Sequence, residues 1–237
     1  RDILIAWSPA INFQLDPASK RHVPIPIKHR ELTRVMDRFG NIRTPGATMH
    51  YGSSYWSDKS REAAMTGLRQ TSELSFELVL QPGARKLKSW GRPCSVAAMA
   101  SENNWSFWIG QINDRIVGRI SLGDPAPEEA NAPLIEIGRI SDPAELYHVV
   151  VAYKPGAMTC FVNGKQTLAT SNFKAALSHG FGRRQQLRFG CFLPDGYPPW
   201  YGRLHAFAWY RKALTAAEVA ATHAGFQKQA AAHPRPR

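Results

Sequence analysis

Paired carboxylates are the first residues to consider, because hydrolysis of a glycosidic bond needs two carboxyl groups about 5–10 Å apart. Glu73 and Glu77 lie on one face of a strand-like segment, but four extended residues place them about 13 Å apart. Glu128 and Glu129 lie in a proline-rich stretch, and Glu136 stands alone in a short strand pattern. We therefore interpret each of these carboxylates as a solvated charge and expect no hydrolase activity.

The histidines and serines do not form a recognisable nucleophilic site. No Gly-x-Ser-x-Gly sequence is present, so the chain lacks the turn that exposes a nucleophilic serine in hydrolases of that type. His148 lies in the middle of a strand pattern and is interpreted as a structural residue, and His205 has no evident catalytic partner. The sequence therefore favours a protein that is not an enzyme.

The sequence gives equally little evidence of a metal site or a reactive thiol. Cys94, Cys160 and Cys191 form no Cys-x-x-Cys pair, and no histidine lies near enough to complete a zinc knuckle. One disulfide plus a free thiol and three buried thiols are both compatible with this spacing. No cofactor is expected from these residues.

Aromatic side chains beside amides could instead recognise a ligand. The stretch 193–203 carries Tyr197, Trp200 and Tyr201, and the stretch 103–108 carries Asn104 and Trp105. Loops of a β-sandwich gather at the ends of its sheets, so these residues could share one binding rim. The competing interpretation places the tryptophans, including Trp108, in the core and leaves Tyr197 as the most exposed candidate.

The chain is strongly basic, with 30 Lys and Arg against 18 Asp and Glu and a formal net charge of +12. The proline-rich segment 8–50 includes Arg30, Arg34 and Arg38 and is interpreted as an irregular basic arm or insertion. A basic tail ends in Arg235 and Arg237. Such charge either favours an anionic neighbour or serves solubility. Nucleic acid is not favoured, because no nucleic-acid-binding motif accompanies the charge.

Alternating apolar residues dominate from residue 73 onward. They predict strands at 73–80, 94–100, 105–111, 114–122, 134–138, 146–153, 158–162, 165–170, 187–192 and 203–210. Asn163-Gly164 predicts a type I′ hairpin, and Thr215 with Glu218 predicts a capping box before a helix at 216–233. The spacing predicts an all-β, two-sheet antiparallel sandwich at 1–213, followed by a helix and basic tail at 214–237.

Several stretches carry a family resemblance. The segments 147-YHVVVAYKPGAMTCFVNGKQTLA-169 and 200-WYGRLHAFAWYRKALT-215 resemble the laminin-G-like, concanavalin A-like jelly roll of secreted bacterial proteins. The resemblance implies that 203–210 is a closing strand with one face on the opposing sheet and the other under the helix or a partner. Some family members hold calcium through loop carboxylates, so the resemblance makes Asp37 and Asp195 candidate calcium ligands. Related glucanases carry Glu-x-Asp-x-Glu on one strand, which is absent here.

The resemblance and the charge together favour a non-catalytic accessory subunit outside the cytoplasm. It would dock onto a larger protein complex with an acidic surface, through the basic arm, the tail and the end loops. The chain begins with Arg1 rather than Met, which is consistent with a removed export signal. A carbohydrate-binding module using Tyr197, Trp200 and Asn104 is the alternative, and a glycoside hydrolase is third. No run of about 18 apolar residues predicts a transmembrane helix.

Overall fold

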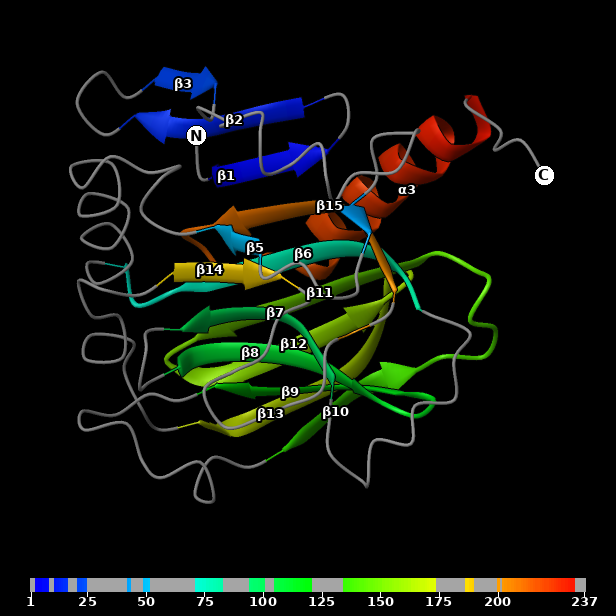
Figure 1. Ribbon diagram of the computed structural model, residues 1–237. Helices are drawn as coiled ribbons and strands as arrows, with labels where there is room; N and C mark the ends of the chain where they lie inside the picture. Colours follow the sequence, from blue (N-terminus) through cyan, green and yellow to red (C-terminus); the bar gives the residue numbers. More distant parts are fainter. Residues whose placement is uncertain are drawn as a thin grey trace.

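The computed structural model places the chain in two antiparallel sheets with a helix at the C-terminal end (Figure 1). The residues that it describes are 3–8, 11–16, 21–24, 42–43, 49–51, 71–82, 94–100, 105–120, 134–173, 186–189, 200 and 202–232. This is the jelly-roll β-sandwich with a C-terminal helix that the sequence predicts.

Sheet A holds nine strands within the described residues. Along it lie, in order, β13 (Lys165–Phe173), β12 (Gly156–Val162), β11 (Tyr147–Lys154), β6 (Leu74–Gln81), β15 (Arg203–Tyr210), β1 (Ile3–Ser8), β2 (Ile11–Asp16) and β3 (Arg21–Pro24), with β4 (Ile42–Arg43) also paired to β15. The strand β6 lies between β11 and β15, so strands far apart in sequence are hydrogen-bonded neighbours. The pairing of β6 with β15 joins the first half of the chain to its C-terminal part.

In the part of the chain that the structure describes, sheet B holds six strands. In order they are β10 (Ile135–Arg139), β9 (Arg115–Ile120), β8 (Trp105–Ile112), β7 (Cys94–Ala100), β14 (Gln186–Phe189) and β5 (Met49–Tyr51). The predicted strands from residue 73 onward are confirmed, most of them to within one or two residues. The predicted hairpin is also confirmed, because Asn163 and Gly164 have φ angles of 51° and 75° between β12 and β13.

The main core fills the space between the two sheets. Phe76 on β6 stacks on Phe107 of β8 at a centroid distance of 3.7 Å, and on Trp209 of β15 at 5.2 Å. All three rings are at most 3% exposed. These contacts join sheet A to sheet B through aromatic side chains that each bury a large apolar area.

The helix α3 (Ala216–Ala232) covers the other face of sheet A. Its Val219 and the preceding Leu214 pack with Val150, Phe161 and Ala208 in a second cluster of buried residues. Strand β15 is therefore buried on both faces, as the family resemblance implies for the closing strand. In Figure 1, α3 lies behind β15 on the side of sheet A away from β8 and β9.

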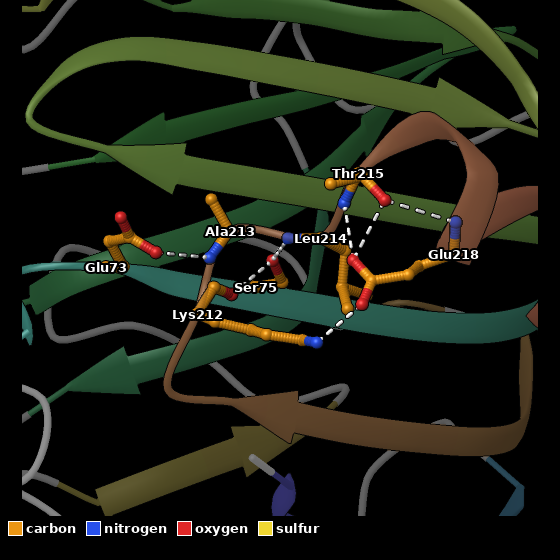
Figure 2. A network of polar contacts seen from close by, with 7 residues as sticks. All are labelled: Glu73, Ser75, Lys212, Ala213, Leu214, Thr215 and Glu218. Carbon is orange, nitrogen blue, oxygen red and sulfur yellow. Dashed lines mark hydrogen bonds and ion pairs between the residues drawn. The ribbon is translucent and has the colours of Figure 1, made fainter.

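The link from β15 to α3 is fixed by a polar network (Figure 2). The Ser75 hydroxyl donates to the Lys212 carbonyl and accepts from the Leu214 amide, both at 2.8 Å. Glu73 accepts a hydrogen bond from the Ala213 amide at 3.1 Å. Ser75 of β6 and Glu73, the residue just before β6, thus hold three consecutive residues of the link.

The first turn of α3 carries the predicted capping box. The Glu218 amide donates to Thr215 Oγ1 at 3.3 Å, and the Thr215 amide donates to Glu218 Oε2 at 2.9 Å. Lys212 Nζ donates to the other oxygen of Glu218 at 2.5 Å. Hydrogen bonds from Lys212 and Thr215 lower the pKa of the Glu218 carboxyl to about 2, so the cap stays ionised over a wide pH range.

The segment 8–50 differs from the irregular arm expected from the sequence. It contains the strands β2, β3 and β4 and the start of β5, and the first three belong to sheet A. In β2 the apolar Ile11, Phe13 and Leu15 alternate with polar residues, which is an ordinary strand pattern. The prolines and basic residues around these short strands hid that signal. Much of the segment, including Arg30, lies outside the described residues.

Candidate functional site

The predicted rim residue Trp200 lies in the core between the sheets. Its ring is 1% exposed, and its indole N–H donates to Gln111 Oε1 at 2.7 Å. A Cβ atom at Gly202 would lie 2.0 Å from the Trp200 ring, so a glycine is required there. Trp200 therefore fixes the end of sheet A against β8 and does not offer its ring to a ligand.

The other predicted site residues lie outside the part of the chain that the structure describes. The backbone of Trp105 begins β8, but its side chain is among the undescribed parts. The remaining predicted residues outside the described ranges are Asn104, Tyr197, Tyr201, Arg30, Arg34, Arg38, Arg235, Arg237 and the calcium candidates Asp37 and Asp195. Their role in binding stays a prediction.

The outer face of sheet B carries a buried tryptophan. Phe107 and Ile109 point into the main core, so Trp108 between them lies on the opposite face of β8. Its ring is 1% exposed and lies over Gly110, where a Cβ would come within 2.2 Å of it. Arg119 of β9 pairs with Trp108 across the strands. Trp108 is thus buried, as the core interpretation expects, but on the other side of its sheet.

Charged side chains gather at the end of sheet B next to the β8–β9 turn. Arg139 contacts Glu136 at 3.1 Å and Asp114 at 3.6 Å, and Arg115 contacts Glu136 at 3.7 Å. We call these four residues the charged edge. Their side chains are 40–68% exposed, so these ion pairs are solvated and contribute little to stability. The charged edge is therefore an exposed polar surface of sheet B.

A polar cluster lies between sheet A and α3. Glu77 of β6 accepts from His148 Nε2 at 2.7 Å through one oxygen and from the Tyr210 hydroxyl through the other. His148 is 1% exposed, and the Glu77 side chain is 12% exposed. The sequence interpretation of Glu77 as a solvated charge is therefore wrong. The structural role expected for His148 agrees with this position.

The electrostatics of Glu77 favour the carboxylate form. Burial alone would raise the pKa of the Glu77 carboxyl, but hydrogen bonds from His148, Tyr210 and Thr222 outweigh burial and lower it. Burial and the adjacent carboxylate raise the pKa of Tyr210. A carboxylate with both oxygens engaged below a helix is poorly placed to exchange protons with a substrate.

A signal for this cluster was present in the helix. Val219, His223 and Phe226 follow the i, i+4, i+7 spacing of a buried helix face. Such a face needs a sheet surface to cover, and Glu77 lies on the non-core face of β6. Neither the helix pattern nor the strand pattern alone places Glu77 under α3. The two patterns predict this position only in combination.

The two described cysteines are not reactive centres. Cys94 and Cys160 are both buried and free, so no disulfide joins them. Burial raises the pKa of the Cys94 thiol to about 11 and that of the Cys160 thiol to about 12. Thiols of this kind stay protonated at physiological pH and behave as small apolar side chains.

Two further features bear on ligands and membranes. Within the described ranges, no three His, Cys, Asp or Glu side chains come together as a metal site would require. Among the helical residues that the structure describes, none forms a span long and apolar enough to cross a bilayer.

The sequence matches the family described as the concanavalin A-like lectin/glucanases superfamily over residues 53–220. No curated protein matches the chain. Among solved structures it is similar to the Ruminococcus gnavus IT-sialidase CBM40 bound to alpha2,3 sialyllactose. That match has a TM-score of 0.56 and 12% identity, and covers 77% of this chain and 96% of the module.

The receptor-binding parts of botulinum neurotoxins are also similar. The type G receptor binding domain matches with a TM-score of 0.50 and 11% identity, over 65% of this chain and 38% of that chain. The binding domain of neurotoxin DC, solved in complex with rat synaptotagmin II, matches with a TM-score of 0.50 and 14% identity, over 67% and 37%. This chain thus spans less than two fifths of those domains. At such identities these likenesses establish the fold.

Proposed function

Because the chain belongs to the concanavalin A-like lectin/glucanase superfamily, we propose that it is a non-catalytic binding domain. In this proposal it works outside the cytoplasm as an accessory subunit and docks onto an acidic surface of a larger protein complex. The basic segments and the end loops make the contact. The observation that carries the proposal is the net charge of +12 on a fold that also serves binding modules.

The engagement of the described glutamates supports a non-catalytic role. Glu77 is held by His148 and Tyr210 below α3, and Glu73 accepts from the backbone of the β15–α3 link. Glu136 is paired with arginines in the charged edge. Each carboxylate that the sequence offered for hydrolysis, and that the structure describes, has a structural partner.

The distribution of charge supports an anionic partner. Most of the excess positive charge lies in segments outside the described residues, including Arg30, Arg34 and Arg38. Excess positive charge steers association with an acidic surface, and this attraction weakens as salt screens it. If the chain docks in this way, its binding to the partner should weaken strongly as ionic strength rises.

A salt-dependent pull-down with charge-matched variants tests the proposal. The triple variant R30A/R34A/R38A removes three charges from the basic segment. The control K154A/K165A/K228A removes three charges from lysines that the structure exposes. We expect a stoichiometric partner that binds the wild type and the control at low salt, is lost at high salt, and fails to bind the first variant. Equal weakening of both variants, or recovery of the chain alone at both salts, would refute docking through the basic segment.

Carbohydrate binding is the second candidate. The observation that favours it is the similarity to the CBM40 module over 96% of that module's length, since that module was solved with a bound glycan. Because Trp200 is buried, Tyr197 and Asn104 remain as the candidate contacts. A glycan array with the wild type, Tyr197→Ala and the control Gln166→Ala on exposed β13 tests this candidate. Binding that only Tyr197→Ala abolishes would support it, and a blank array would argue against it.

A further inference from the structure

Two imidazole rings stack between sheet A and α3. His148 of β11 and His223 of α3 have ring centroids 5.3 Å apart and planes 16° from parallel. Phe226, one turn further along α3, lies 6.4 Å from His148. On another side, the β12–β13 turn contacts His223, since a Cβ at Gly164 would lie 3.0 Å from its ring. The middle of α3 therefore rests on a histidine that is itself 1% exposed.

The charged and titratable groups around the pair come from each element that packs there. Strand β6 supplies Glu77, β11 supplies His148, and β15 supplies Tyr210. The β12–β13 turn supplies the exposed Lys165. Along α3, Glu218 is engaged by Lys212 and Thr215, and Lys228 is exposed.

A proton on His223 would be poorly accommodated. The two Glu77 oxygens already accept from His148 and Tyr210. The Nδ1 atoms of His148 and His223 are buried and have no hydrogen-bond partner among the described residues. A positive charge on His223 would therefore be buried beside His148 without a new acceptor at Nδ1.

The direction of the pH effect follows from this placement. Burial of the ring and the neighbouring His148 lower the pKa of His223 from its ordinary value of 6.5. The unfolded or detached helix thus binds the proton more readily than the packed one. The stability that neutral His223 contributes is fully present above pH 6.5 and is lost as pH falls below that value.

The two ends of α3 differ in how they are held. The N-terminal end is fixed by the Ser75 and Glu73 hydrogen bonds and the capping box, none of which involves a histidine (Figure 2). We propose that α3 is a pH-sensitive latch. In mildly acidic conditions, protonation of His223 releases the helix from His223 onward while its N-terminus stays anchored. Release uncovers His148, on which His223 and Phe226 stack, and is independent of the function proposed above.

Hydrogen exchange of the full chain at pH 7.5, 6.5 and 5.5 tests the latch, with rates corrected for the intrinsic effect of pH. This range isolates histidine, because the carboxyl of Glu77 has a pKa below its ordinary value of 4.5 and stays ionised. We expect protection at 223–228 to fall between pH 7.5 and 5.5 while β6 stays protected. Each unit of pKa difference allows about a tenfold change in protection.

Three variants make the outcome specific. His223→Phe keeps a ring on the sheet but cannot titrate, so its helix protection should not change with pH. His148→Gln keeps a donor for Glu77 and removes the second imidazole, so it should reduce the pH effect. His50→Gln on β5 of sheet B should behave as the wild type. An unchanged wild-type helix, an equal pH effect in His223→Phe, or simultaneous loss of protection in β6 would overturn the latch.

Discussion

Removing the Ser75 hydroxyl should destabilise the domain far more than removing an equally buried hydroxyl elsewhere. Ser75 is 0% exposed and holds the β15–α3 link through the Lys212 carbonyl and the Leu214 amide, both at 2.8 Å. Ser95 on β7 is 1% exposed, and its Oγ has no hydrogen-bond partner among the described residues. Ser75→Ala and Ser95→Ala are therefore a matched pair that differs in hydrogen bonding alone.

The expected magnitude follows from the groups that each substitution leaves behind. In Ser75→Ala, the buried Leu214 amide loses its acceptor, which costs about 1–3 kcal/mol. The Lys212 carbonyl belongs to a half-buried residue and loses a donor, which adds about 0.5–1.5 kcal/mol. We expect a total loss of about 1.5–4.5 kcal/mol in the free energy of unfolding. Ser95→Ala removes a buried hydroxyl without a partner and should leave stability unchanged or higher.

Urea unfolding measures both variants against the wild type. The midpoint should shift strongly for Ser75→Ala with an unchanged m-value, because the surface exposed on unfolding stays the same. Hydrogen exchange should show the extra opening at 211–219, next to the lost bonds. Equal midpoint shifts for Ser75→Ala and Ser95→Ala would refute the reasoning, since the hydrogen bonds would then carry none of the effect.

Three other perturbations test separate parts of the fold. Gly110→Ala places a Cβ within 2.2 Å of the Trp108 ring and should lower the free energy of unfolding by about 1–3 kcal/mol, measured by thermal unfolding. Gly225→Ala on α3 meets open space and should raise the free energy of unfolding by as much as about 1 kcal/mol. Thr215→Ala removes the cap of α3 and should cost about 1 kcal/mol, and an unchanged helix signal and stability would contradict the capping box. Glu77→Gln should destabilise at pH 6 by about 1–3 kcal/mol, and the difference from wild type should shrink as pH falls below 4.5, because protonation of wild-type Glu77 removes the same contribution.

The elements that the sequence predicts well are those with strong local signals. Strand 203–210 has the predicted bounds, and the helix predicted at 216–233 is found at Ala216–Ala232. Both are marked by residues close in sequence, a run of alternating apolar side chains and a capping box. The Asn163-Gly164 hairpin is equally local, because two residues with positive φ determine it.

The features that escaped prediction depend on pairing between distant segments. Strands β4 and β5 have two and three residues, too few for any periodicity, and exist because β15 and β14 supply hydrogen-bond partners. The register of β15 shifts between Leu204 and Ala206, so Leu204 and Phe207 both reach the main core despite their odd spacing. A bulge of this kind is invisible in a pattern of alternation.

The burial of sheet A by α3 determines where the described part of the chain could meet a partner. Where α3 packs on β11, β12 and β15 of sheet A, a ligand would reach the sheet only if the helix moved. Sheet B has the charged edge and Arg119 on its outer side, on the face opposite the main core. Docking through charge should therefore depend on salt and remain unaffected by His223→Phe. Partner binding that appears only below pH 6.5 and is abolished by His223→Phe would instead place the contact under α3, and would make the latch part of the binding mechanism.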